Sequence, residues 1–247
     1  MSDIKWCIEY LKKINDIKDD LDDSFITFRA LLNITMPTNL SDEFYIKQDN
    51  VLKEIISSKQ IMDVASFKNG ITIYKGDITL IKADAVVNAC NSKLLGCFVP
   101  NHHCIDNAIH TFAGLEVRRD MIDIMIKQGH DEENGQVKVS NGYNLPSKYI
   151  FHTVGPIYSG LSKDNIDLAN CYYSCLKKAD EMKLESIVFC SLSTGLFGFP
   201  IEKASKIAIK CVKNYLKNEN RNIKKVIFDL FNEKDYETYI RKIKEID

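Results

Sequence analysis

From Gly70 onward the chain alternates strand-like with helix-like segments, and this alternation constrains the fold more than any other feature. Helices are expected over about 104–127, 165–183 and 201–217, and after the last strand. Stretches rich in β-branched and aromatic residues are expected to be strands, at 71–74, 83–89, 136–140, 149–154, 186–190 and 225–231. This order predicts an α/β/α sandwich around a mixed, largely parallel sheet. Ligands bind such sheets at the loops that follow the strands.

The residues before Gly70 contain no glycine and follow a helical pattern. Helices are expected where Ile8, Leu11 and Ile14 share one face, over 25–32, and over about 42–57 behind Ser41 as N-cap. We therefore expect an N-terminal helical extension over residues 1–67 and a second domain over residues 68–247.

Charge and composition exclude several classes of function. The 33 basic and 34 acidic residues give a net charge of −1, so polymeric nucleic acid is not an expected partner. The N-terminal segment has no signal-peptide pattern, and no apolar run of about 18 residues predicts a membrane span. We expect a cytoplasmic protein whose eight cysteines are reduced, either buried, as for Cys171 and Cys175, or bound to metal.

One short segment, residues 96–106, concentrates side chains that bind metals. It contains Cys97, His102, His103 and Cys104, and thiolate with imidazole suits zinc. Three protein ligands would leave one coordination position open, as in catalytic zinc sites. The spacing also fits a plain loop with buried cysteines and solvated histidines, and it does not choose between the two histidines.

Three further segments follow expected strands and could hold a nucleotide. Residues 191–200 contain two glycines before a helix, where backbone N–H groups can bind phosphate or simply form a β–α turn. Asp77 could accept a hydrogen bond from an adenine amine or cap a turn. The asparagines of 88–92 could address ribose hydroxyls or close a turn.

Together these segments resemble the macrodomain family over roughly residues 70–240. The matching motifs are GDIT at 76–79, NACNS at 88–92, HTVGP at 152–156 and STGLFG at 193–198. The family's glycine run before its catalytic aspartate is replaced here by the Cys/His loop, and the whole pattern GCFVPNHHCIDNAIH resembles the zinc-dependent subclass. The resemblance implies a macrodomain-type sheet between helices, with Asp106 at the position of the catalytic aspartate and one zinc ion per chain on Cys97, His102 and Cys104. Cys90 departs from the usual alanine and could be open to oxidation.

The resemblance implies a hydrolase that removes mono-ADP-ribose from modified Asp or Glu side chains. Asn91 and Asp106 are its expected catalytic residues. The expected substrate-binding residues are Asp77, Ile78, Asn91, Cys104, Ser193, Thr194, Gly195, Leu196, Phe197 and Phe231. Expected partners are ADP-ribose and an ADP-ribosylated acceptor, for which the subclass suggests a lipoyl-carrier-like protein and a sirtuin-type ADP-ribosyltransferase. A non-catalytic ADP-ribose reader is the main alternative.

The sequence leaves the chemistry of the metal open. Zinc can activate water or polarise the substrate, whereas two thiolate ligands weaken its acidity and make a role in orienting the distal ribose equally plausible. Asp106 could orient or deprotonate the nucleophile. His110 is expected to pack or donate a hydrogen bond, and His152 to be structural.

Overall fold

The central feature of the structure, a computed structural model that describes residues 1–65 and 70–246, is one six-stranded sheet. Its strands are β1 (Ile71–Lys75), β2 (Ala85–Cys90), β3 (Val137–Asn141), β4 (Tyr149–Val154), β5 (Ser186–Phe189) and β6 (Lys225–Leu230). Their order across the sheet is β1-β6-β5-β2-β4-β3, and only β3 runs antiparallel to its neighbour. The predicted mixed, largely parallel sheet is confirmed.

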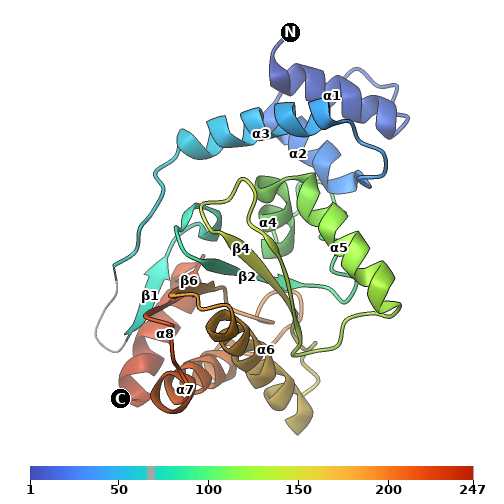
Figure 1. The fold of residues 1–247 in the computed structure, drawn as a ribbon. Helices are drawn as coiled ribbons and strands as arrows, with labels where there is room; N and C mark the ends of the chain where they lie inside the picture. The colour runs from blue at the N-terminus through green and yellow to red at the C-terminus, as the bar shows by residue number, and fades with distance from the viewer. Residues whose placement is uncertain (66–69, 247) are drawn as a thin grey trace.

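Helices cover both faces of this sheet (Figure 1). Helices α4 (Ile105–Ala113) and α5 (Leu115–Gln128) lie on one face, where they contact β2 and β3. The other face carries α6 (Ser162–Glu181) and α8 (Glu233–Ile246), with α7 (Ile201–Asn218) packed between these two helices. Cys171 and Cys175 are fully buried in this layer, as expected. In the described part of the chain, no helix combines the length and apolar character that a membrane crossing requires.

One predicted element was wrong: the single helix over 104–127 is two helices. Gly114 separates α4 from α5 with a φ of +106°, which L side chains rarely adopt. A Cβ there would also lie 2.6 Å from Gln48 Nε2, so the break leaves room for a residue from the N-terminal region. Continuous apolar periodicity across the glycine concealed the turn.

The N-terminal region forms α1 (Asp3–Ile14), α2 (Phe25–Ile34) and α3 (Asp42–Ser57), with Ser41 Oγ capping α3 through the Phe44 N–H. Its helices share their own apolar core, which contains Ile8 and Leu11. Ile14, expected on the same helix face, is exposed and lies outside that core. Leu115 of α5 completes that core, and the region rests on α4 as an added layer (Figure 1). The predicted boundary between residues 67 and 68 lies outside the described residues.

Candidate functional site

Four neighbouring strands bring the singled-out segments to one edge of the sheet. Strands β1, β6, β5 and β2 are adjacent and parallel, so their carboxyl ends meet at the same edge. Asp77 follows β1, Phe231 follows β6, the 191–200 loop follows β5 and Asn91 follows β2. Segments more than 150 residues apart in the chain therefore form one continuous row.

Asn91 and Asp106 lie together at the β2 end of this row. Asp106 stands in the first turn of α4 and is buried. Its Oδ1 accepts a hydrogen bond from Asn88 Nδ2 at 2.8 Å, and its Oδ2 accepts one from Asn91 Nδ2 at 3.4 Å. Burial raises the pKa of Asp106 to about 6, although the Asn88 hydrogen bond opposes that shift. Two amides therefore fix both oxygens of one carboxylate.

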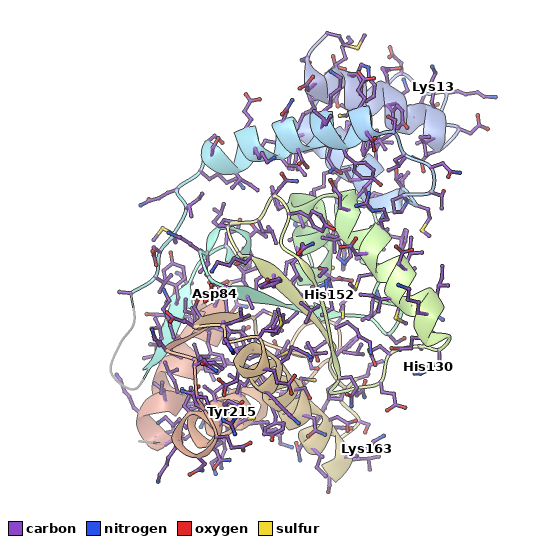
Figure 2. The ribbon with its side chains drawn as sticks, in the orientation of Figure 1. Lys13, Asp84, His130, His152, Lys163 and Tyr215 are labelled. Carbon is purple, nitrogen blue, oxygen red and sulfur yellow. The ribbon has the colours of Figure 1, made fainter. Side chains whose placement is uncertain are left out.

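The two histidines near Asp106 lie behind it, in the interior. His110 Nε2 is 3.5 Å from Asp106 Oδ1, and burial holds the His110 pKa well below its usual range, so this pair is no salt bridge. His152, labelled in Figure 2, is fully buried on β4 and contacts Asn88 and Ser140. Burial lowers its pKa to about 3. Both rings are buried and pack in the interior, as expected, and burial disfavours the charged form of each.

Cys97, His102 and Cys104 form a cluster of side chains that could hold a metal ion. Their ligand atoms all lie within 4.8 Å of one another, and Cys97 Sγ is 3.5 Å from His102 Nδ1. Zn–S bonds of about 2.3 Å and Zn–N bonds of about 2.0 Å in a tetrahedron place such atoms roughly 3.5 to 3.8 Å apart. The three residues therefore fit a zinc ion, whereas His103 is exposed and outside the cluster. Cys104 also caps α4, so the cluster adjoins Asp106.

The 191–200 loop turns tightly at the end of β5. Ser193 has a φ of +63°, and the Gly198 N–H donates to the Gly195 carbonyl oxygen at 3.0 Å. The Phe199 N–H donates to the Ser193 carbonyl oxygen at 2.9 Å, closing the loop on itself. Gly195 and Leu196 at its tip are exposed, while Thr194 and Phe197 are half-buried. The tip therefore presents backbone to solvent immediately before α7.

At the β1 end, Asp77 caps the short 3-10 helix η2 (Ile78–Leu80). Its Oδ1 accepts hydrogen bonds from the Thr79 N–H at 3.0 Å and the Thr79 hydroxyl at 2.6 Å. Ile78 beside it is buried, and Phe231 is 85% exposed beyond β6. Asp229 is buried on β6, and its pKa rises to about 7 through burial and the nearby Asp77 charge.

Sequence reasoning missed several residues of this edge. Asp229 was recognisable as a lone acid within an apolar strand, a pattern that often marks a site. Arg29, Asn107 and Arg118 gave no sequence signal, because their contacts come from tertiary packing. The expected oxidation of Cys90 is not favoured by the structure, since its thiol is buried against the Thr153 carbonyl oxygen and burial raises its pKa.

The structure is an α/β/α domain with a row of loops along one edge of its sheet and an adjoining cluster of cysteine and histidine side chains. The chain belongs to the macro domain family, whose model matches residues 87–208. A protein-ADP-ribose hydrolase of Treponema medium is 44% identical over 247 residues, covering 94% of each chain. A protein-ADP-ribose hydrolase of Staphylococcus aureus (strain MRSA252) is 43% identical and covers 94% of this chain and 93% of its own.

A solved structure supports the same assignment. A mutant of the Oceanobacillus iheyensis macrodomain with ADPR is 36% identical, with a TM-score of 0.67. The match covers 75% of this chain and 97% of that one. The resemblance drawn from the four motifs is thereby confirmed at the level of the family.

Proposed function

We propose that this chain is a zinc-containing hydrolase that removes mono-ADP-ribose from Asp or Glu side chains of an acceptor protein. The observation that carries the proposal is the order of the four strand ends. Neighbouring strands lie about 4.8 Å apart, so the row from β1 to β2 spans about 14 Å, which suits an extended dinucleotide-like ligand. The 44% identical Treponema relative, named as a hydrolase of this kind, supports the reaction class.

In this proposal the ligand follows the row from one end to the other. Adenine lies by Asp77 and Ile78, with the exocyclic amine donating to Asp77 Oδ2 and the exposed Phe231 ring beside the base. The diphosphate lies on the backbone of Ser193, Thr194, Gly195, Leu196 and Phe197, before the N-terminus of α7. The distal ribose reaches Asn91, Cys104 and Asp106.

The reaction breaks the bond between the ribose C1″ and the acceptor carboxylate oxygen. Water attacks C1″, the acceptor carboxylate leaves, and the proton of water passes to Asp106 or onward to solvent. Asn88 and Asn91 orient the Asp106 carboxylate, while Asn91 holds the ribose. Zinc on Cys97, His102 and Cys104 would supply a positive charge that orients and polarises the distal ribose or the attacking water.

The remaining partners also belong to the proposal. We assign the acceptor to a lipoyl-carrier-like protein modified by a sirtuin-type ADP-ribosyltransferase, in the cytoplasm, where the thiols stay reduced. A non-catalytic reader is disfavoured because binding ADP-ribose requires neither a metal-ligating cluster nor a carboxylate with both oxygens fixed.

The test is release of ADP-ribose from a protein modified on glutamate, with binding of free ADP-ribose measured alongside. We expect the wild type to release ADP-ribose and Asp106→Asn to lose release by roughly 100-fold or more, with its affinity for ADP-ribose little changed. Asn keeps the shape of Asp106 but turns one acceptor oxygen into a donor, so the comparison tests the carboxylate as charge and acceptor together. Tight binding without release by the wild type would favour the reader.

A further inference from the structure

The metal-ligating loop, residues 97–104, is held chiefly by side chains outside it. One backbone hydrogen bond, from the His102 N–H to the Val99 carbonyl oxygen at 3.2 Å, turns the loop on itself. Asn101 in the middle has a φ of +54°, an unusual conformation for a residue other than glycine. Such a loop requires partners from elsewhere to keep its three ligands in one arrangement.

Helix α2 of the N-terminal region supplies two of these partners. Arg29 Nη2 donates to the His102 carbonyl oxygen at 3.1 Å, so it fixes the backbone of a metal-ligating residue. Asn33 Oδ1 accepts the Asn101 N–H at 2.9 Å and so holds Asn101, the residue of positive φ that precedes His102. Asn33 is 1% exposed, so both contacts lie in the interface between α2 and the loop.

Arg29 also acts through Asn107 on α4. Its Nε and Nη2 donate to Asn107 Oδ1 at 3.1 and 2.7 Å. Asn107 Nδ2 then donates to the Val99 carbonyl oxygen at 3.0 Å, and its N–H donates to Cys104 Sγ at 3.4 Å. One arginine therefore contacts the His102 backbone directly and orients the Asn107 side chain that donates to Val99, while the backbone N–H of the same Asn107 donates to Cys104 Sγ.

Arg118 of α5 connects the N-terminal region to the residues at the beginning of the loop. It donates to the carbonyl oxygens of Leu95, Leu32 and Thr35, and its guanidinium lies 4.3 Å from the Phe98 ring centre. Leu32 and Thr35 belong to α2 and its C-terminal cap. Helix α2 is therefore connected to the beginning of the loop through Arg118, and to its later residues through Arg29 and Asn33.

We propose that α2 acts as a clamp that preorganises the metal-ligating loop, with Arg29 as its positioning residue. The inference rests on the zinc site of the proposed function and gives the N-terminal region a specific task in it. Groups that orient metal ligands from outside the coordination sphere contribute about 10- to 100-fold to metal affinity. Arg29 fixes the backbone of His102 through its carbonyl oxygen, and it holds the side chain of Asn107, whose backbone N–H donates to Cys104 Sγ.

The test measures zinc affinity by competition with a chromophoric chelator, on the full chain without substrate. We expect Arg29→Gln to weaken zinc binding about 10-fold or more. Arg29→Lys keeps the charge and one donor, so it should recover part of that loss. The matched control is Arg119→Gln, because Arg119 also lies between the two regions, over the Tyr45 ring, but contacts α3 instead of the loop.

Equal zinc affinity in the wild type, Arg29→Gln and Arg119→Gln would overturn the clamp while leaving the metal site in place. An equal loss in Arg29→Gln and Arg119→Gln would also overturn it, because docking alone would then account for the effect. A wild type that binds no zinc would overturn the clamp together with the metal site. Affinity is read without substrate, so failure of the hydrolase proposal is detected separately, by the release assay.

Discussion

The metal-ligating loop and the 191–200 loop lie at the same edge of the sheet but are stabilised in opposite ways. The 191–200 loop closes through its own backbone, with hydrogen bonds between Phe199 and Ser193 and between Gly198 and Gly195. The 97–104 loop depends on Arg29 and Asn33, which lie about 70 residues earlier in the chain. A loop that offers backbone N–H groups can be specified locally, whereas one that offers side-chain ligands is shaped by what packs around it.

The comparison predicts that damage to one loop leaves the other's function intact. The largest effect is expected from the substitution of Cys104. Cys104→Ala should reduce bound zinc from about one per chain to near zero and slow ADP-ribose release by roughly 100-fold or more. Metal content and turnover are measured on the same sample. The affinity for free ADP-ribose, measured alongside, reports whether the 191–200 loop is intact.

Two variants control this experiment. Cys104→Ser keeps an oxygen to cap α4 but is a poor zinc ligand, so it should match the alanine variant in zinc loss. Cys211→Ala removes a half-buried thiol on α7 and should change nothing. Full turnover by metal-free Cys104→Ala would contradict the role given to the cluster.

The complementary variant damages the 191–200 loop instead, through Gly155, which lies against Ser193 of that loop. A Cβ at Gly155 would lie 2.1 Å from Ser193 Oγ, so alanine must displace the Ser193 side chain within that loop. Overpacking of this kind costs about 1–3 kcal/mol, and we expect ADP-ribose affinity to fall on the order of tenfold. Calorimetry gives that affinity. A parallel fall in zinc affinity would mean that the two loops are coupled.

An effect of similar size is expected at the adenine end. Asp77→Ala should weaken ADP-ribose binding by about 1–3 kcal/mol through loss of a hydrogen bond from the exocyclic amine. Asp77→Asn keeps the cap on Thr79 and separates that local role from ligand binding. If binding titrations give wild-type affinity for Asp77→Ala, the base lies elsewhere.

The last predicted effect is on stability and concerns docking of the N-terminal region, on which the metal-ligating loop depends and the 191–200 loop does not. Gln48 of α3 donates to Glu116 at 2.8 Å, and burial raises the Glu116 pKa to about 7. The raised pKa means that Glu116 favours folding when protonated, and this contribution is lost as pH rises through 7. The stability of Glu116→Gln relative to the wild type should therefore increase by about 2 kcal/mol from pH 5 to pH 8. Denaturant unfolding at both pH values measures it, and a constant difference would contradict the assignment.

The sequence predicted the fold well because its signals are local. Alternating apolar runs located all six described strands, and the helix cap at Ser41 was correct. The break at Gly114 was missed because the apolar periodicity continues across it, whereas the close approach of Gln48 arises only from tertiary packing. The same limit applies to the site. Cys97, His102 and Cys104 stand in a short motif, whereas Arg29, Asn33 and Arg118 reach the loop only after the chain has folded.

Removal and return of zinc on the wild-type chain tests the central claim most directly. After chelation, we expect release of ADP-ribose from a glutamate-modified protein to stop, while free ADP-ribose still binds through the 191–200 loop, and added zinc should restore release. Undiminished release by a chain shown to be free of metal would contradict the account.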